Sequence, residues 1–375
     1  MRKTSIILLA AALPMAVQAA NTDYKFGGYV KFDAMMSKYS EGELAAANLG
    51  RDFYVPSSIP VGTAGNDSTA TDMGAKTSRF NLKSVTTLDN GEKVVTFVEM
   101  DFLGSAQGNE VVSNSYSPRL RHAFFKHGNY TFGQTWTTFM NPANLAETVD
   151  FLGVSESTVF ARQAMVRYTN GPLQLALENS ETFLYNTNGG ATVNDDNSLP
   201  DLIVRYNLKT DTASVSVAGI ARQLSYAVAA TDTDESKTVF GFTASGKVQL
   251  GKDDLKFSVT KGKVGRYVGL GAFRDGAIAA DGSIATVDTT AYYLGYRHFW
   301  TDSVRSSLVY SAASADLPDA AGVQTEKAKS VRANVMWTPA PKMTYGVEVS
   351  KASRELSDGT DGDLKRLQFT AKYAF

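Results

Sequence analysis

Hydrophobic and polar side chains alternate along most of this chain of 375 residues, whereas convincing helical periodicity is scarce. In YKFGGYVKFDAMMSK, one face of an extended strand would carry mainly apolar side chains: Tyr24, Phe26, Val30, Phe32, Ala34 and Met36. The opposite face would carry polar ones: Lys25, Lys31, Asp33 and Ser37. The C-terminal LQFTAKYAF repeats the pattern, with one face made of Leu367, Phe369, Ala371, Tyr373 and Phe375. About sixteen such segments of roughly ten residues follow one another, the length that a tilted membrane-spanning strand needs.

The connections between these segments alternate strictly between short and long. Short ones lie at 89–91, 127–129, 170–172, 209–212, 251–254, 301–302 and 339–341. Long polar ones lie at 39–75, 104–117, 139–160, 184–200, 226–237, 262–288, 314–327 and 354–363. The Asn-Gly pairs among the short connections favour tight hairpin turns.

This arrangement predicts an all-β fold: a transmembrane, up-and-down antiparallel β-barrel of about 16 strands, with tight periplasmic turns and long outer loops. Pairing of the first and last strands would leave no open edge in lipid. Trp300 and Trp337 lie beside short turns, and together with the aromatic chain ends they predict an aromatic girdle at that rim. A soluble β-sandwich would not require the difference between short and long connections.

The N-terminus predicts export. Arg2 and Lys3 precede the apolar run 6–13, and Val17-Gln18-Ala19 provides small residues for cleavage after Ala19. We therefore expect a signal peptide over residues 1–19 and the barrel over 20–375. The run is too short for a transmembrane anchor. An exported chain of this size without any Cys suits a Gram-negative envelope and excludes disulfides and thiolate chemistry.

Removal of two basic residues with the signal peptide leaves 35 basic against 38 acidic residues, a formal charge of −3. Together with a pI of about 6.3, this charge gives no indication of nucleic-acid binding. The acidic clusters in the outer loops, such as Asp358/Asp361/Asp363, are more typical of solvated loops than of cation sites. We expect no cofactor and no metal centre.

On the predicted strands, charged side chains occupy the alternate positions that face the lumen. Arg79, Arg119, Arg121 and Arg167 alternate with apolar neighbours, and an Arg facing lipid near the midplane would cost ~2–4 kcal/mol. These four are therefore expected to point inward, with further inward charges at Glu99, Asp101, Arg205, Arg297, Arg305, Arg332 and Glu348. Arg162 would have the wrong parity within a strand and is expected at the end of the preceding loop. A charged, wet lumen of this size predicts a channel.

The third long loop contains the carboxylates Glu147 and Asp150, with Glu156 a further candidate. If this loop folds inward, its carboxylates would face the arginines of the wall, and the two charge sets would screen solutes by size and charge. Several arginines at one constriction favour small anions, especially those with two carboxylates, because Arg binds a carboxylate bidentately. The alternative is that these arginines only pair with Glu99, Asp101, Glu147 and Asp150 to hold the wall together.

At these residues the chain resembles the DcaP-like porins, outer-membrane channels associated with dicarboxylate uptake. The matching stretches are TSRF (77–80), RLRHAFF (119–125), FGQTWTTFM (132–140), ETVDFLG (147–153) and RQAMVRYT (162–169). The resemblance implies a homotrimer of sixteen-stranded barrels in the outer membrane, an inward third loop, and an arginine-rich constriction. The constriction that the resemblance implies consists of Arg79, Arg119, Arg121, Arg162 and Arg167. Some members carry an N-terminal coiled coil, whereas here the first strand is expected about four residues after the cleavage site.

The sequence therefore predicts an outer-membrane porin for passive diffusion of small anionic solutes, with dicarboxylates as the leading class. The alternatives are a general non-specific porin, and a barrel with an adhesive or structural role. An outer-membrane hydrolase is less favoured, because none of His122, His127 and His298 accompanies a nucleophile motif such as G-x-S-x-G. In this interpretation the side chains of His122 and His298 are expected to point to the outside of the barrel.

Overall fold

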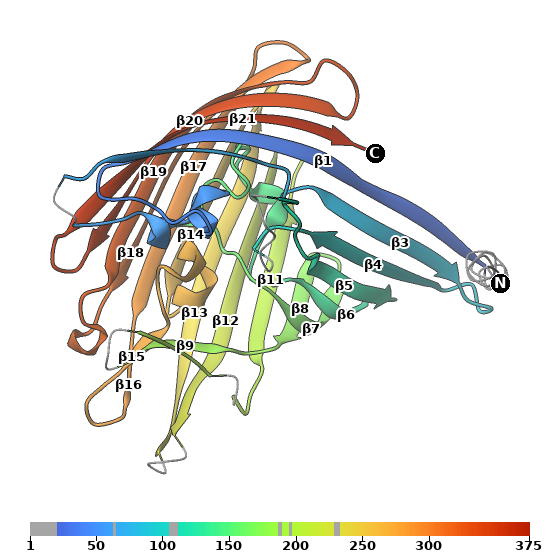
Figure 1. Ribbon diagram of the computed structural model, residues 1–375. Coiled ribbons are helices and arrows are strands. Elements are labelled where there is room, and N and C mark those ends of the chain that lie inside the picture. Colours follow the sequence, from blue (N-terminus) through green and yellow to red (C-terminus); the bar gives the residue numbers. More distant parts are fainter. Residues whose placement is uncertain (1–20, 63–64, 105–111, 187–189, 195–196, 229–232) are drawn as a thin grey trace, which may run out of the picture.

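The computed structural model describes residues 21–62, 65–104, 112–186, 190–194, 197–228 and 233–375. The expected signal peptide lies outside these residues. The described part of the chain folds mainly into antiparallel strands that form a barrel (Figure 1). No helix there is long and apolar enough to cross a lipid bilayer. Its helical segments are short 3-10 turns: Leu49–Arg51, Pro56–Ser58, Pro142–Asn144, Gly265–Tyr267, Gly269–Gly271 and Asp319–Ala321.

The wall of the barrel is a single sheet of seventeen strands. Its first half contains β1 (Thr22–Tyr39), β2 (Ser68–Gly74), β3 (Arg79–Thr87), β4 (Lys93–Asp101), β5 (Arg119–His127), β6 (Tyr130–Trp136), β7 (Arg162–Asn170) and β8 (Leu173–Glu178). Its second half contains β11 (Asp201–Lys209), β12 (Ala213–Val228), β13 (Thr233–Leu250), β14 (Asp253–Gly262), β17 (Asp288–Phe299), β18 (Val304–Asp316), β19 (Thr325–Trp337), β20 (Met343–Leu356) and β21 (Asp361–Ala374). Because β2 and β3 pair with successive halves of β1, they occupy one position, and the wall has sixteen positions.

The barrel closes between its first and last strands, as the sequence predicts. β1 pairs antiparallel with β21 from Tyr29↔Ala374 to Tyr39↔Leu364. Closure satisfies the backbone groups of both strands, which an open edge in lipid would leave without partners. At the closing rim, the rings of Phe26 and Phe375 lie 5.6 Å apart.

The burial pattern is the reverse of that in a soluble protein. On β19, Val331, Val335 and Trp337 are 43–52% exposed, whereas Ser330 and Arg332, on the other face, are 2% exposed. The apolar face therefore points outward and the polar face inward, which is the pattern of a strand between lipid and a polar interior.

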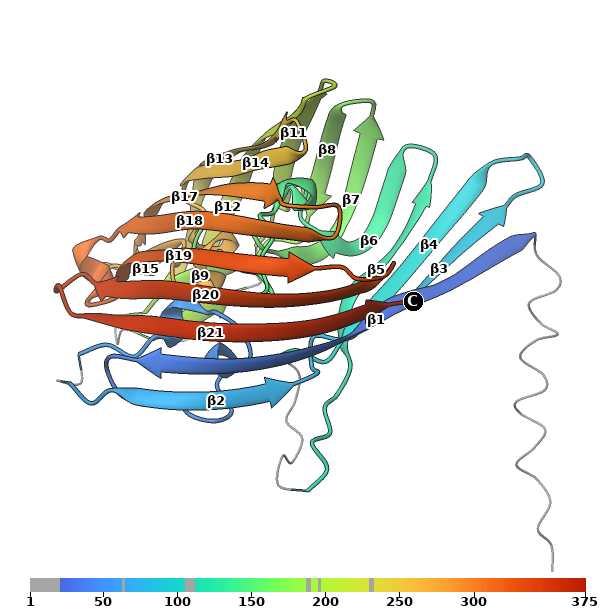
Figure 2. The ribbon, with the colours of Figure 1, turned by 90° about the horizontal axis from the view of Figure 1, so that it is seen from above.

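All seven short connections are tight turns between consecutive wall strands, and Figure 2 shows several of these turns on the side of the C-terminus. The predicted long connections needed corrections at three places. The first, 39–75, contains the wall strand β2. At 226–237 and 354–363 the sequence suggested loops, but β12 continues to Val228, β13 begins at Thr233, and β20 and β21 are separated only by residues 357–360. Polar residues at these strand ends hid the strand pattern.

Two of the long connections contain their own sheet. It consists of β9 (Thr182–Tyr185), β10 (Ala191–Asn194), β15 (Gly276–Ile278) and β16 (Ile284–Thr286), in the order β10-β9-β15-β16. Leu184 of β9 and Ile284 of β16 are buried with Leu224 of the wall strand β12. The apolar side chains of this small sheet therefore pack against the inner face of the wall.

The strand β5 contains a bulge that changes one predicted orientation. Glu99 pairs with His122, but the next residue, Met100, pairs with Leu120, so that Arg121 is extra. A bulge shifts the alternation of faces by one residue. His122, expected to face outward, is instead 6% exposed, with Nδ1 3.0 Å from Thr135 Oγ1.

Candidate functional site

The third loop, residues 137–161 between β6 and β7, follows the inner face of the wall. Its backbone receives hydrogen bonds from side chains of one wall strand after another. The donors and their acceptors are Arg205 of β11 with Met140 O, Lys256 of β14 with Leu145 O, Tyr293 of β17 with Asn144 O, Asn334 of β19 with Glu147 O, and Lys31 of β1 with Val149 O. These contacts hold the loop against the inner face of the wall, from β11 to β1.

Glu147 of this loop forms its ion pairs with β17 and β18. Arg305 donates from Nε and Nη2 to the two carboxylate oxygens of Glu147, both at 2.8 Å, and Arg297 donates from Nη1 at 3.1 Å. Burial alone would raise the pKa of Glu147, but the hydrogen bonds and charges of Arg305 and Arg297 outweigh burial and lower the pKa. Glu147 therefore forms its ion pairs with Arg297 and Arg305 and not with Arg79, Arg119 or Arg121.

Asp150 is 3% exposed and stabilises the loop itself. It accepts hydrogen bonds from the backbone N–H groups of Gly153 and Tyr54, at 3.0 and 2.9 Å, and lies 3.6 Å from Nη1 of Arg366 on β21. Asp150 does not form an ion pair with the arginines that the sequence suggested, because its carboxylate already interacts with Tyr54, Gly153 and Arg366.

Glu156 is fully buried and accepts a hydrogen bond from Ser330. Burial raises its pKa, although the charge of Arg332 acts in the opposite direction. Its second carboxylate oxygen has no hydrogen-bond partner among the described residues. Ser330 and Arg332 are both on β19, and the partners of Glu156 do not include Arg79 or Arg119.

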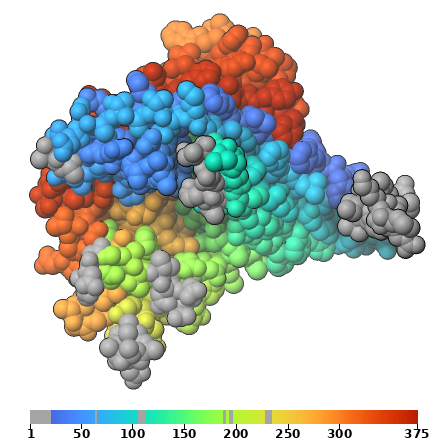
Figure 3. Space-filling model, in the orientation of Figure 1, coloured from blue at the N-terminus to red at the C-terminus, as the bar shows by residue number. Residues whose placement is uncertain are grey.

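The first long connection, residues 40–67, packs onto the third loop. Ser155 Oγ donates to the carbonyl oxygen of Tyr54 at 2.8 Å, and Arg366 donates to that of Gly50 at 2.6 Å. Burial raises the pKa of Tyr54 well above its ordinary value. In Figure 3 the N-terminal part of the chain, in blue, covers the upper part of this face of the molecule.

Arg119 and Arg121 share two carboxylates of β4. Arg119 donates to both oxygens of Asp101 at 2.9 Å, and Arg121 donates to Glu99 and Asp101, each at 2.7 Å. Arg121 is 1% exposed and Asp101 is fully buried. The inward orientation predicted for both arginines is confirmed, and Arg121 acts as an internal clamp between β4 and β5.

Arg79 and Arg162 add positive charge to this cluster without adding carboxylates. Arg79 lies 3.6 Å from Glu99, which already binds Arg121. Arg162, the first residue of β7, lies over the ring of Trp136 at 4.8 Å, and it has no ion pair with a carboxylate in the described part of the chain. One side-chain nitrogen each of Arg79 and Arg162 is buried without a hydrogen-bond partner among the described residues.

These observations define the arginine cluster: Arg79, Arg119, Arg121 and Arg162, with Glu99 and Asp101. Arg79, Arg119 and Arg121 share two carboxylates, and Arg162 adds a fourth cation, so the cluster carries a surplus of positive charge. Arg162 lies in the field of the other three arginines. Phe151 of the third loop covers the cluster, 5.6 Å from the guanidinium carbon of Arg79 and 5.7 Å from that of Arg121.

Arg167 is separate from this cluster. It donates to the carbonyl oxygen of Trp136 at 2.6 Å and to Thr138 Oγ1 at 2.7 Å. Because its hydrogen bonds go to the start of the third loop, Arg167 supports the loop where it leaves β6.

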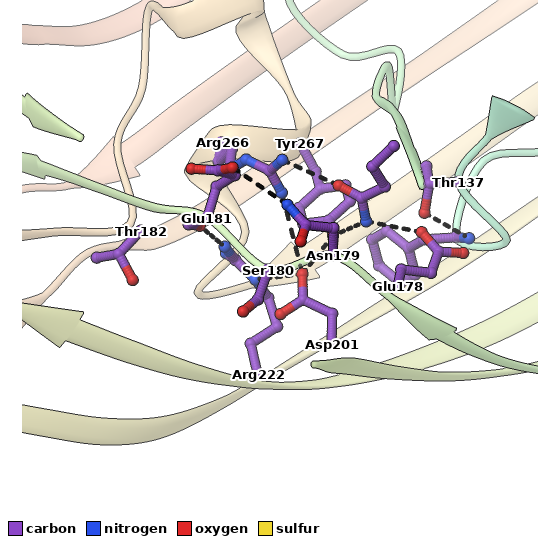
Figure 4. A network of polar contacts seen from close by, with 12 residues as sticks. Thr137, Glu178, Asn179, Ser180, Glu181, Thr182, Asp201, Arg222, Arg266 and Tyr267 are labelled. Atoms are coloured by element: carbon purple, nitrogen blue, oxygen red, sulfur yellow. Dashed lines mark hydrogen bonds and ion pairs between the residues drawn. The ribbon is translucent and has the colours of Figure 1, made fainter. Parts of the chain in front are cut away.

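A second network was not predicted from the sequence. Arg222 of β12 binds Asp201 of β11 and Asp275 of the loop before β15, at 3.2 and 2.7 Å, and all three side chains are buried. Figure 4 shows Arg222 and Asp201 with Tyr267 and Arg266 nearby. Tyr267 donates to Asp201 at 2.6 Å. Burial raises the pKa of this phenol, so it remains a donor. The network connects the loop between β14 and β17 to the wall. The alternation of faces places Arg222 on the inner side of the barrel, but the sequence alone does not reveal its distant partner.

The barrel and its polar interior agree with the comparison to known families. A sequence model of the DcaP outer membrane protein family matches residues 10–375. The chain belongs to the DcaP family. No protein in the curated set matches it.

Solved structures agree with this DcaP assignment. The chain is similar to the crystal structure of the outer membrane channel DcaP of Acinetobacter baumannii, with a TM-score of 0.77 and 25% sequence identity over 95% of this chain and 98% of that chain. An anion-selective porin from Comamonas acidovorans has a TM-score of 0.58 and 13% identity over 94% and 100% of the two chains. A trimer form of OmpT from Vibrio cholerae has a TM-score of 0.53 and 12% identity over 94% and 99%.

The protein is therefore an outer-membrane channel of the DcaP type, located in the outer membrane and built as a porin barrel. The DcaP family and these neighbours are channels and not enzymes.

Proposed function

We propose that this DcaP-family channel allows passive diffusion of small anionic solutes, with dicarboxylates as the leading class. The observation that carries the proposal is the charge imbalance of the arginine cluster, where three arginines share Glu99 and Asp101 and Arg162 adds a fourth cation. A solute with two carboxylates would supply the missing negative charge and could accept bidentate hydrogen bonds from guanidinium groups.

We propose Arg79, Arg119 and Arg162 as the side chains that contact the solute. Arg79 and Arg119 are partly exposed, at 22% and 28% of their side-chain surface. Arg121 would act indirectly by holding Glu99 and Asp101 in place. Arg167, Glu147 and Asp150, which the sequence suggested for the constriction, would set its width by fixing the third loop.

Basic side chains on the neighbouring strands support the same selectivity. Lys372 of β21 pairs in register with Lys31 of β1 and lies in the field of Arg305 and Arg79. Glu147 moderates the field at Lys372, and Asp33 forms an ion pair with Lys31 at 2.9 Å. Opposed charges along a narrow path orient a charged solute and exclude solutes of the wrong sign.

We further propose that the channel assembles as a homotrimer through the side of the barrel with short strands. The strands β3 to β8 have 6–9 residues each, compared with 12–18 in β12, β13 and β17–β21. Leu82, Leu120 and Leu177 are exposed on these short strands. Such a surface can pack against another copy, and a trimer form is described for the outer membrane protein OmpT of V. cholerae.

The test is a liposome-swelling series with purified protein, using matched mono- and dicarboxylates and a neutral sugar of similar size. The proposal expects dicarboxylates to enter faster than monocarboxylates, and both faster than the sugar. Equal rates for all three would indicate a non-specific porin, and no swelling at all would indicate a closed or structural barrel.

A further inference from the structure

The outer face of the barrel carries a row of lysines that the channel function does not use. Lys38 on β1, Lys365 on β21 and Lys351 on β20 are exposed, and they pair directly in the register Lys38↔Lys365↔Lys351. The three side chains therefore stand next to one another on the same face of three adjacent strands, which Figure 1 shows side by side. We call them the lysine row.

Like charges directly opposite one another destabilise a sheet. Two of the three lysines have partial compensation, Lys38 from Asp67 and Lys351 from Asp363 at 3.0 Å. Lys365, in the middle, has no ion pair among the described residues. The lysine row thus carries a positive charge at its centre that its own strands do not neutralise.

An apolar groove adjoins the lysine row. It has a volume of about 690 Å³, and the three lysines form part of its lining. Its apolar side chains are Met36, Val331, Ala333, Val349 and Leu367. The register Met36↔Leu367↔Val349 places an apolar residue two positions from each lysine, in the direction of the tight-turn rim.

The position of the lysine row along the barrel matches a membrane boundary. Lys365 precedes Tyr373, at the tight-turn rim, by eight residues on β21. Eight residues span about 27 Å of strand, and a tilt of about 40° reduces this to about 20 Å of height. The apolar band of an outer-membrane barrel is about 25 Å tall. The lysines therefore lie near the outer edge of the band and the groove lies inside it.

We propose that the lysine row and the groove form a binding site for a phosphorylated, acylated lipid of the outer leaflet. The phosphate accepts hydrogen bonds from Lys365, Lys351 and Lys38, and an acyl chain lies in the groove along Leu367 and Val349. The carboxylates Glu355, Asp361 and Asp363 lie nearer the outer ends of these strands, so the phosphate reaches the lysines from the membrane side.

The experiment uses native mass spectrometry of the purified full-length protein in detergent. The probes are an acylated glucosamine disaccharide with two phosphates and the same lipid without phosphates. The test variant carries Lys38→Gln, Lys351→Gln and Lys365→Gln. The control is Lys261→Gln, because Lys261 is also exposed near the outer end of its strand, β14, but lies away from the groove.

The proposal expects the wild-type protein to bind the phosphorylated lipid at least about tenfold more tightly than the unphosphorylated lipid. The triple variant should lose this preference, and Lys261→Gln should keep it. In detergent without lipid, the triple variant should unfold at the same or a higher temperature than the wild type, since repulsion is removed. Equal binding of both lipids by the wild type, or an unchanged preference in the triple variant, would overturn the proposal.

Discussion

Arg305 on β18 donates two parallel hydrogen bonds, each 2.8 Å long, to the carboxylate of Glu147 in the third loop. These residues are far apart in sequence, and their pairing fixes the loop to the wall opposite the arginine cluster. The same carboxylate binds Arg297. The negative charge of Glu147 is thereby neutralised by Arg297 and Arg305, and it does not compensate the arginine cluster.

Replacing Glu147 by Ala should release this part of the loop. Hydrogen bonds to charged groups contribute about 1.5–3 kcal/mol, so the anchored arrangement should weaken by a similar amount. Arg305 should become free to attract anions, whereas Arg297 keeps its ion pair with Asp254. Planar-bilayer recordings in a KCl gradient should show noisier single-channel currents and a reversal potential shifted toward higher chloride permeability. A shift toward potassium would contradict the assignment.

The buried carboxyl of Glu156 should make stability depend on pH. Burial raises its pKa above the ordinary 4.5, so the native state holds the proton more tightly than the unfolded state. The associated stabilisation is fully present below pH 4.5 and is lost as the pH rises through the native pKa. Glu156→Gln should therefore be at least as stable as the wild type at pH 7.

The measurement is the midpoint of thermal unfolding of both proteins at several pH values. The difference in favour of Glu156→Gln should shrink as the pH falls toward 4.5. If the variant were instead less stable at pH 7 by the same amount at every pH, Glu156 would be acting only through its hydrogen bond with Ser330.

Arg222 should be essential for holding the loop between β14 and β17. Arg222→Leu leaves the carboxylates of Asp201 and Asp275 buried without their cation, and breaking a buried pair in this way costs about 3–5 kcal/mol. The variant should unfold at lower urea concentration, and protease should cut the loop in intact cells.

Asp302→Asn is the matched control, because it breaks the exposed pair with Lys252, and exposed pairs are worth about 0–1 kcal/mol. Equal losses of stability in the two variants would show that burial of the Arg222 network does not determine its contribution.

Substitutions at Arg162 and Arg167 should distinguish contact with the solute from support of the third loop. Arg162→Ser removes a cation that has no carboxylate partner in the described part of the chain. The dicarboxylate-to-sugar flux ratio should fall about tenfold, the effect of about 1.4 kcal/mol. Arg167→Ser removes hydrogen bonds to Trp136 and Thr138. It should change the flux of all solutes together, and a selective loss of dicarboxylate flux would reverse the two roles.

Much of the fold follows from alternation and turn chemistry, because lipid outside and a polar interior impose a simple rule on every strand. The rule correctly oriented Arg119 and Arg121. It failed at His122, because a bulge adds one residue to β5 and no local sequence signal marks it. It also misjudged the ends of β12, β13, β20 and β21, which extend into polar sequence beyond the apolar band.

The site was less predictable than the wall. Glu147 and Asp150 were correctly assigned to the third loop, but their partners depend on the path of that loop across the barrel. Arg305 and Arg366 lie far from them in sequence, and parity gives only the face of a strand, not which distant residue meets it. The pairing of Arg222 with Asp275 was hidden for the same reason.

The central claim is that the positive surplus of the arginine cluster selects small dicarboxylates. The most direct measurement compares the succinate-to-sugar flux ratio in liposomes containing the wild type and the variant Arg79→Ser, Arg119→Ser, Arg162→Ser. Arg121 is kept because it holds Glu99 and Asp101. Unchanged sugar flux and retention of a heat-stable folded form would show that the variant still makes an intact channel. The account predicts a large fall in the ratio with unchanged sugar flux, and an unchanged ratio would contradict it.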